Sequence, residues 1–330
     1  MIGWQARKIV RLNYLLELLK DRRIIANLGR SCVAPAWRAH FNSMSVGRRT
    51  AGIHYNYCMN DLDPGSLTSA INLRYQQLGR LVQQLPPKGS RPLTVSGRVS
   101  GWVTAKATRV VDGLPGVHVE AEAVHVTAAA SQRITLKAVL ERIAQTLRDA
   151  NCLRGWRNEL IDVVGEGRTL SVIERAAMRP LGLLTRAVHL NAWTPTGNLW
   201  IARRALNKST DPGMWDTLVG GLVGAAESLD ASLLRESNEE AGLAPAALEG
   251  RDPLRMILRM HRRLPEGYQV EDLLASECVL AESVRPANQD GEVSEIRNVP
   301  VAEVWSMIQA GEFTLEAELV ILDGLRRRGL

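Results

Sequence analysis

Residues 221–243 read GLVGAAESLDASLLRESNEEAGL, a stretch that brings three glutamates together within five positions. On a helix, Glu236, Glu239 and Glu240 occupy an arc of about 100° on one face. Neighbouring carboxylates repel each other, so helix stability gives no reason to cluster them. A divalent cation removes the repulsion, and an all-oxygen ligand set suits hard ions that also bind phosphate. The stretch predicts a helix that binds Mg²⁺, with Mn²⁺ as the second choice, against the alternative of an ordinary acidic surface helix.

The residues around the cluster also keep a fixed spacing. A glycine is followed six positions later by a glutamate, and then by Arg-Glu-x-x-Glu-Glu-x-Gly and an apolar residue. This spacing resembles the Nudix box, and the positions in register are Gly221, Glu227, Arg235, Glu236, Glu239, Glu240, Gly242 and Leu243. Ser237 departs from the pattern, because the family has a bulky apolar residue there. Ser237 falls on the side of the helix that carries Leu233 and Ala241, so the departure concerns packing and not the metal-binding face.

The glutamates are the expected catalytic and metal-binding residues. Glu236 and Glu240, at i and i+4, are the first choice as metal ligands, with Glu239 beside them. The carbonyl of Gly221 is a further candidate ligand, because glycine permits close approach of the backbone. Glu292 lies in a glycine-containing turn, where it is a candidate second-site ligand or base, or else a solvated loop carboxylate.

The other residues of the box are expected to hold the structure together. Glu227 and Arg235 are expected to pair and to fix the loop to the helix, with direct metal ligation by Glu227 as the alternative. Ser228 is a candidate N-cap, and Gly242 suits the end of the helix.

Basic residues on a predicted strand and the loop after it are candidates for substrate binding. Arg203, Arg204 and Lys208 are suited to contact phosphate oxygens, although solvated surface charge is an equal interpretation. Because successive side chains of a strand point to opposite faces, only one of Arg203 and Arg204 is expected to face the site. Asp216 completes the candidate substrate-binding set.

Aromatic side chains offer a weaker signal. Trp193, Trp200 and Trp215 are candidates for stacking on a heteroaromatic ring, but core packing is the favoured interpretation. His189 lies in an apolar strand and is interpreted as a structural histidine.

Further blocks outside the box resemble one Nudix subfamily, which carries its own N-terminal domain and in some members is fused to a thiamine pyrophosphokinase domain. The blocks include WRNEL at 156–160, IERA at 173–176, VHLN at 188–191, LWIARR at 199–204, DGEV at 290–293 and GEF at 311–313. The resemblance implies a hydrolase that cleaves thiamine diphosphate, or its oxidised or damaged analogues, to the monophosphate and phosphate. Two alternatives stay open: a Nudix hydrolase of nucleoside diphosphate derivatives (nucleotide sugars, dinucleotides or damaged nucleotides), and a non-catalytic Nudix-fold regulator that binds a metabolite.

Charge is distributed unevenly along the 330 residues. Residues 1–58 carry a net charge of +8, so the remainder is slightly acidic at −2 although the whole chain is +6. The first 58 residues are interpreted as a disordered basic extension, as upstream translation with Met59 as the native start, or as a targeting segment. The rest is expected to form an accessory α+β domain over 59–150 and a Nudix hydrolase domain over 151–330.

Apolar periodicity predicts the elements of these two domains. Helices are expected over 65–85, 136–147, the glutamate stretch, 300–310 and 314–328. Strands are expected over 92–111, 116–127, 159–164, 168–175, 217–223, 254–262 and 272–282, with a hairpin of 187–194 and 198–204. The order fits an α/β class, an α/β/α sandwich with a mixed sheet, which is the fold that the Nudix resemblance implies.

Cysteine usage and hydropathy bear on compartment and partners. The four cysteines lie far apart without a CxxC pair, which fits a reducing cytoplasm. No stretch approaches the length of a membrane span. The expected partner is a small-molecule diphosphate, with neither nucleic acid nor membrane; the sequence does not indicate the oligomeric state.

Overall fold

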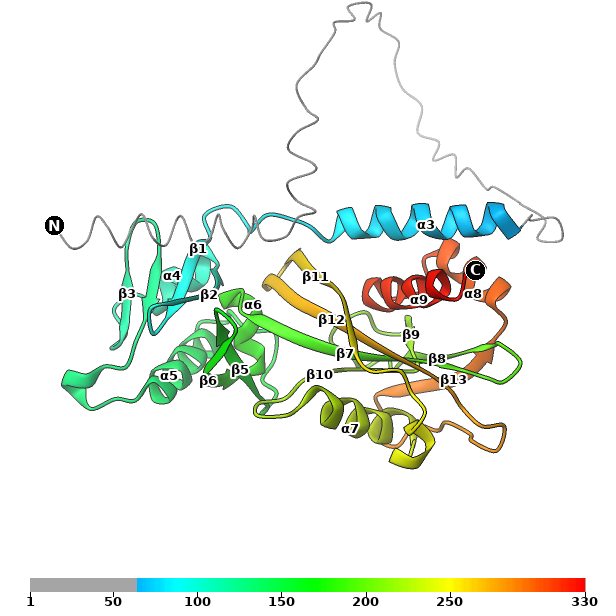
Figure 1. Ribbon diagram of the computed structural model, residues 1–330. Helices are drawn as coiled ribbons and strands as arrows, with labels where there is room; N and C mark the ends of the chain where they lie inside the picture. The colour runs from blue at the N-terminus through cyan, green and yellow to red at the C-terminus, as the bar shows by residue number, and fades with distance from the viewer. Residues whose placement is uncertain (1–63, 330) are drawn as a thin grey trace, which may run out of the picture. The chain divides into compact units, whose positions relative to one another are not determined.

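The computed structural model describes residues 64–329 (Figure 1). The expectations for residues 1–58, including a native start at Met59, fall outside the described residues. No helix in the described part of the chain is long and apolar enough to cross a membrane.

A four-stranded sheet opens the described chain after a first helix, α3 (Pro64–Leu81). Its strands are β1 (Arg91–Val95), β2 (Arg98–Val103), β3 (Val117–Val119) and β4 (Val124–Val126), in the order β2-β1-β4-β3. Helix α5 (Leu136–Asp149) covers this sheet with Val139, Leu140 and Ile143 buried. The predicted helix over 136–147 is therefore confirmed.

The predicted strand over 92–111 is wrong in its second half. Residues 105–111 form helix α4 (Ala105–Val111), and Ser96 and Gly97 make a turn between β1 and β2. Thr104 caps α4, because its hydroxyl accepts a hydrogen bond from the amide of Ala107. The valines at 110 and 111 favour a strand by propensity, but the cap and the tertiary packing of Ala107 and Val111 decide for a helix.

Residues 160–183 join the core of the first sheet. Strands β5 (Leu160–Gly165) and β6 (Arg168–Glu174) form a hairpin, followed by the short helix α6 (Met178–Leu181). Ile161, Ile173 and Leu181 pack in the same hydrophobic cluster as β1 and α5. A domain boundary at 150–151 stays a prediction.

A seven-stranded mixed sheet forms the centre of the second half. It consists of β7 (Leu184–Trp193), β8 (Leu199–Arg204), β9 (Trp215–Thr217), β10 (Val219–Leu222), β11 (Arg255–Leu264), β12 (Gly267–Val279) and β13 (Val293–Val299). The main order is β11-β12-β7-β8-β13, with β10 on β7 and β9 on β8. Strand β7 runs parallel to β12, whereas its other sheet contacts are antiparallel.

The hairpin of 187–194 with 198–204 exists only at its tip. Strands β7 and β8 pair through Ala192 with Trp200 and Trp193 with Leu199. The earlier residues of β7 pair instead with β10, and β8 continues along β9 and β13. The predicted single strand over 217–223 is accordingly two strands, because the chain changes partner at Leu218.

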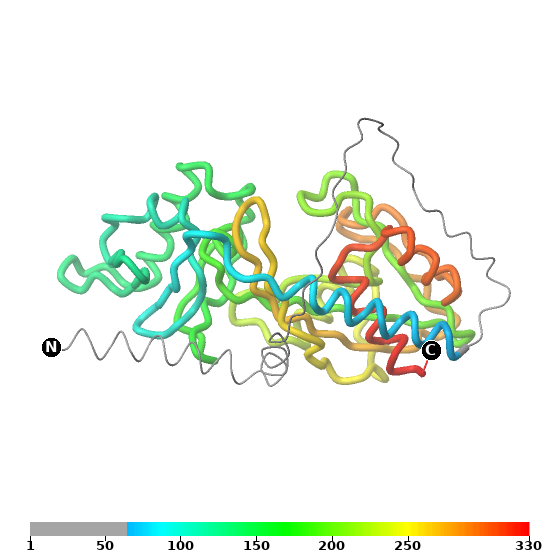
Figure 2. Tube along the Cα trace, turned by 90° about the horizontal axis from the view of Figure 1, so that it is seen from above, coloured from blue at the N-terminus to red at the C-terminus, as the bar shows by residue number. Residues whose placement is uncertain are grey.

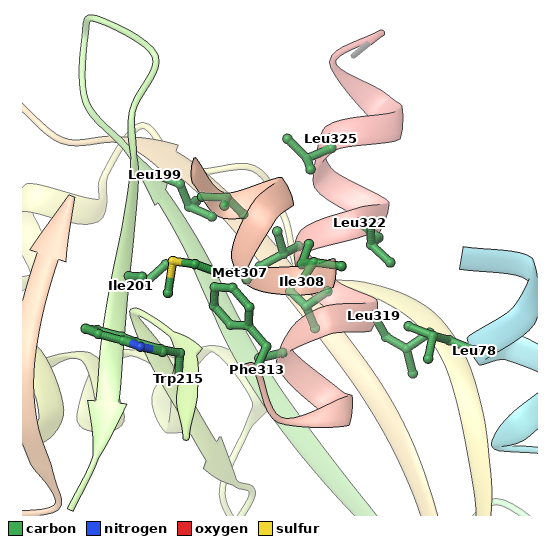
Figure 3. Close-up of a cluster of buried hydrophobic side chains, with 14 of the residues drawn as sticks. Leu78, Leu199, Ile201, Trp215, Met307, Ile308, Phe313, Leu319, Leu322 and Leu325 are labelled. Atoms are coloured by element: carbon green, nitrogen blue, oxygen red, sulfur yellow. The ribbon is translucent and has the colours of Figure 1, made fainter. Parts of the chain in front are cut away.

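Helices cover both faces of the mixed sheet, so the predicted sandwich is confirmed. Helix α7 (Leu229–Ala241) packs on one face through Leu233 and Ala241, below the sheet in Figure 1. Helices α8 (Val301–Ala310) and α9 (Leu315–Arg327) cover the other face, where Ile308, Leu319 and Leu322 are buried (Figure 3).

Helix α3 adds to the α9 side, although it lies far away in the sequence. It runs alongside α9 (Figure 2). Ile71 and Leu78 belong to the same hydrophobic cluster as Leu319. Arg74 also pairs with Glu318 of α9 at 2.6 Å.

Candidate functional site

Helix α7 presents the glutamates, and both of its ends are capped. The Ser228 hydroxyl accepts a hydrogen bond from the Ala231 amide at 3.1 Å. At the other end Gly242 has φ 63°, a left-handed conformation that disfavours a residue with a side chain. Ser237 is buried, on the side of α7 away from the carboxylates. Its hydroxyl has no hydrogen-bond partner among the described residues.

Arg235 binds three glutamates at once. Its Nε and Nη2 donate to the two carboxylate oxygens of Glu227, at 2.9 and 3.0 Å. Its Nη1 lies 2.9 Å from Glu236 and 3.0 Å from Glu239. The hydrogen bonds from Arg235 lower the pKa of Glu227 below its ordinary value, despite partial burial. Arg235 therefore fastens the loop that carries Glu227 to the helix, and it holds Glu236 and Glu239 side by side.

Glu236 lies directly against the backbone of Gly221. A Cβ atom at position 221 would stand 2.0 Å from the carboxyl carbon of Glu236, so only glycine leaves room for the carboxylate. The Glu236 side chain is 13% exposed. Burial raises its pKa, and the charges of Glu239 and Glu292 act in the same direction. The charge and hydrogen bond of Arg235 oppose this rise, so burial is the main cause of the raised pKa and the neighbouring carboxylates add to it.

Glu240 has a different environment from the other two glutamates. It is buried, and the amide of Gly220 donates to its Oε2 at 2.8 Å. Burial raises the pKa of Glu240 to about 8, although the Gly220 amide favours the charged form; Glu236 and Asp216 raise the pKa further. Glu240 therefore faces the β10 backbone, while Glu236 and Glu239 face the cavity.

A cavity of about 720 Å³ opens beside these carboxylates. Glu227, Arg235, Glu236 and Glu239 line one end of it. Other walls come from both halves of the chain and include Glu159, Arg175, Arg204, Lys208, Asp216 and Glu292. Eight of the sequence-predicted site residues thus line the cavity together with the backbone of Gly221.

The two neighbouring arginines of β8 point in different directions. Arg204 lines the cavity and pairs with Asp216 at 3.0 Å. Arg203 does not line it; it donates to the carbonyl of Gly213 and lies over the ring of Trp215. The strand alternation therefore places Arg204 at the site and Arg203 away from it.

Glu292 forms an ion pair with Lys208, and both residues line the cavity. Burial alone would raise the pKa of Glu292, but the hydrogen bond and charge of Lys208 outweigh it and leave that pKa lowered. Glu292 is thus a charged, paired carboxylate at the cavity wall.

The tryptophans belong to the core, whereas His189 reaches the site. Trp193, Trp200 and Trp215 are at least nine-tenths buried in hydrophobic clusters, and none of them lines the cavity. His189 lines the cavity, and its Nδ1 lies 2.9 Å from the Thr217 hydroxyl. Burial lowers the pKa of His189, so the ring is neutral near pH 7.

Many of the residues that line the cavity were not predicted from the sequence, and three of them carry polar side chains on its β12 and α9 walls. Gln269 and Glu271 lie on β12 and Glu316 at the start of α9. The sequence carries no distinct signal for this pair on β12, because Asp272, Ser276 and Glu277 of the same strand are polar as well.

A hard cation requires several oxygen ligands that point to one position. As the side chains stand, the described residues contain no group of three or more His, Cys, Asp or Glu arranged to hold a metal ion. Arg235 explains this, because its Nη1 occupies the position between Glu236 and Glu239. The chemistry of the set nevertheless fits Mg²⁺: the donors are carboxylate oxygens that repel each other and adjoin a cavity.

Comparisons with known proteins agree with this geometry. The profile of the NUDIX domain matches residues 183–318, and that of the domain of unknown function DUF4743 matches residues 74–185. Nudix hydrolase 20, chloroplastic, of Arabidopsis thaliana is 33% identical over 193 residues, which is 57% of this chain and 51% of that protein. Nudix hydrolase 24, chloroplastic, of the same plant is 32% identical over 195 residues, 57% of this chain and 53% of its own.

The chain spans about half the length of these curated relatives. Among solved structures, DR0079 from Deinococcus radiodurans is 24% identical, covers 52% of this chain and 98% of its own, and has a TM-score of 0.38. Over residues 74–318 the chain therefore matches a DUF4743 domain followed by a NUDIX domain, and its sandwich is the Nudix fold.

Proposed function

We propose that this protein is a Mg²⁺-dependent hydrolase of a small-molecule diphosphate, a Nudix hydrolase that cleaves a phosphoric anhydride. The observation that supports it most is the group of mutually repelling carboxylates, Glu236 and Glu239 with Glu292 nearby, at one end of a cavity of about 720 Å³. One guanidinium, that of Arg235, faces the three carboxylates of Glu227, Glu236 and Glu239, so this group keeps a net negative charge that suits a cation and that a binding module does not need. The non-catalytic regulator is therefore the less favoured alternative.

Glu236, Glu239 and Glu240, with the Gly221 carbonyl, are the residues that would hold the metal. When bound, Mg²⁺ (or Mn²⁺) supplies charge neutralisation for the diphosphate and lowers the pKa of a water molecule. Glu227 and Arg235 keep the helix and loop in register through their paired hydrogen bonds.

The remaining wall residues have roles in positioning and proton transfer. Arg204 and Lys208 contact phosphate oxygens, and Asp216 orients Arg204 through their ion pair at 3.0 Å. Glu292, which Lys208 keeps charged, is the candidate base that accepts a proton from the attacking water.

For the substrate we propose thiamine diphosphate or its oxidised or damaged analogues, which the sequence blocks outside the box favour. The products are the monophosphate and inorganic phosphate. Nucleoside diphosphate derivatives are the second candidate, because a cavity of about 720 Å³ also has room for a nucleoside. A cytoplasmic location and the absence of nucleic-acid and membrane partners are further proposals; the name "chloroplastic" belongs to the Arabidopsis relatives.

Phosphate release from a panel of diphosphates, with MgCl₂ and with EDTA, tests the function. The panel contains thiamine diphosphate, its oxidised forms, ADP-ribose, nucleotide sugars and dinucleotides. We expect release only with the metal, and preferentially from a thiamine compound. A tenfold preference for any nucleotide would remove the thiamine assignment and leave the hydrolase. Unchanged turnover in Glu240→Gln would remove the assigned role of the glutamate helix.

A further inference from the structure

Two sequence blocks that the proposed function leaves without a role meet at one wall of the cavity. They are WRNEL at 156–160 and IERA at 173–176. Glu159 and Arg175 both line the cavity, and Arg175 Nη1 lies 2.6 Å from Glu159 Oε2. Both blocks lie within the DUF4743 match and outside the NUDIX match. The DUF4743 domain therefore contributes charged side chains to the wall of the candidate active site.

The backbone that carries Arg175 is held by hydrogen bonds between the two blocks. The Arg175 amide donates to the Glu159 carbonyl at 2.8 Å. The buried Glu174 carboxylate accepts from the amides of Arg157 and Ala176, at 2.8 and 3.3 Å. Arg175 therefore extends from a backbone that is fixed on both sides.

Hydrogen bonds also fix this wall to the loop of the Nudix box that leads into α7. The Ala225 amide donates to the Leu160 carbonyl at 2.9 Å. The neighbouring Ala226 amide donates to Asp162 Oδ1 at 3.3 Å. The wall that carries Arg175 thus keeps a set position relative to the glutamate helix.

Arg175 uses fewer of its guanidinium nitrogens within the described chain than Arg204 and Arg235 do. Its side chain donates there only through Nη1, to Glu159. Arg204 and Arg235 each donate through Nε, Nη1 and Nη2 to protein oxygens. The side chains of Arg175 and Glu159 are 37% and 53% exposed, and an exposed ion pair of this kind contributes little to stability. Nε and Nη2 of Arg175 are therefore available to an anion that enters the cavity.

The charge of Arg175 reaches the residues assigned to the phosphate groups. Burial would raise the pKa of Glu292, but the hydrogen bond and charge of Lys208 outweigh it. The charge of Arg175 is the next influence and lowers the pKa further, ahead of that of Arg204. Arg175 and the two candidate phosphate-binding residues thus act on the same carboxylate.

We propose that the DUF4743 domain completes the substrate site, and that Arg175 binds phosphate oxygens of the diphosphate through Nε and Nη2. These two nitrogens form one edge of a planar guanidinium, which suits two oxygens of one phosphate group. Glu159 holds the guanidinium through Nη1 before the substrate binds. The proposal rests on the proposed function for the kind of substrate, and it makes Arg175 a substrate-binding residue supplied from outside the NUDIX match.

Equilibrium binding of methylenediphosphonate, whose P–C–P bridge cannot be hydrolysed, tests the role of Arg175 independently of turnover. Calorimetry with MgCl₂ measures its dissociation constant for the full chain and for Arg175→Gln, Arg175→Lys and Glu159→Gln. Arg98→Gln and Arg98→Lys are the matched controls. Arg98 is 34% exposed and pairs with Glu166 at 3.0 Å, but it does not line the cavity. Urea denaturation of the same samples shows which variants fold.

We expect the dissociation constant to rise about tenfold in Arg175→Gln and about threefold in Arg175→Lys, and to change by less than about twofold in the Arg98 controls. If Arg175→Gln does not fold, Arg175→Lys against Arg98→Lys decides. Glu159→Gln separates substrate binding from a structural role. It leaves Arg175 free for the anion, so we expect binding as tight as in the wild-type chain or tighter, whereas an ion pair that only held the wall together would weaken binding when either partner is lost.

Three results would overturn the proposal: no binding of methylenediphosphonate to the wild-type chain, folded Arg175 variants that bind it like the Arg98 controls, or equal weakening in Glu159→Gln and Arg175→Gln.

Phosphate release from the panel of diphosphates separates this proposal from the proposed function. Binding that depends on Arg175, without phosphate release from any member of the panel, would contradict the hydrolase and leave Arg175 as an anion-binding residue. Phosphate release with unchanged binding in Arg175→Gln would contradict the role of Arg175 alone.

Discussion

The two ends of the cavity are built from the sequence in different ways. The glutamate end comes from one run of residues, 221–240, in which helix periodicity brings Glu236 and Glu239 together and Arg235 pairs with both. The other end, where Gln269 and Glu271 of β12 meet Glu316 of α9, depends on hydrogen bonds between residues up to 47 positions apart. The charged end can therefore be recognised from local spacing, whereas the β12 end exists only in the folded chain.

The largest effect is expected where the backbone touches a carboxylate. In Gly221→Ala the new Cβ would lie 2.0 Å from the Glu236 carboxyl carbon, so the carboxylate must move. We expect kcat for phosphate release to fall by about 100-fold, the scale of a 1 Å misplacement. Gly250→Ala is the control, because nothing lies within 4 Å of its Cβ position; equal losses in the two variants would contradict the close contact.

Arg235→Lys tests whether paired hydrogen bonds organise the glutamate end. Lysine cannot reproduce the two parallel hydrogen bonds to Glu227, so we expect the unfolding free energy to fall by up to about 2 kcal/mol. Solvent screening of the partly exposed Arg235 side chain reduces the loss below that value. Urea denaturation measures it, with the exposed Arg168→Lys as the control. Unchanged stability of Arg235→Lys would show that Arg235 does not fasten the loop.

Arg204 and Arg203 provide a test of side-chain direction on one strand. Arg204 lines the cavity and Arg203 does not, so Arg204→Ala is expected to raise KM for the diphosphate about tenfold, the effect of one lost charged hydrogen bond. Arg203→Ala is expected to change KM by less than about twofold. The opposite order of the two effects would place the substrate on the other face of β8.

Glu227→Gln has the smallest expected effect and separates pairing from metal ligation. If Glu227 only pairs with Arg235, the unfolding free energy falls by about 1 kcal/mol while the Mg²⁺ concentration for half-maximal release stays the same. A tenfold rise in that concentration at unchanged stability would instead make Glu227 a metal ligand.

The sandwich and the glutamate helix could be predicted because their signals are local. The caps, the helix period and the box spacing all lie within 221–243. The strand expected over 105–111 was wrong because the Thr104 cap and the packing of Val111 overrode strand propensity. The division at Leu218 depends on which strand lies beside it, and sequence spacing does not contain that information.

The positions and directions of the side chains in the site could be predicted only in part. The spacing placed Glu236, Glu239 and Glu240 on one arc, but the Gly220 amide holds the buried Glu240 apart from the other two. Strand alternation required one of Arg203 and Arg204 to face the site without indicating which one. His189 gave no sign that it would line the cavity, because the helix α9 residues near it lie more than 120 positions later in the chain.

Phosphate release by Glu236→Gln in MgCl₂ tests the central claim most directly, with the exposed Glu249→Gln as the matched control. A diphosphate that the wild-type chain cleaves is used at saturating concentration, and the unfolding midpoint is measured on the same samples. We predict that Glu236→Gln loses turnover by at least about 100-fold, because it removes one carboxylate from the metal-binding set, while it stays folded and Glu249→Gln keeps full turnover. Turnover in folded Glu236→Gln equal to that of Glu249→Gln would contradict a catalytic glutamate helix.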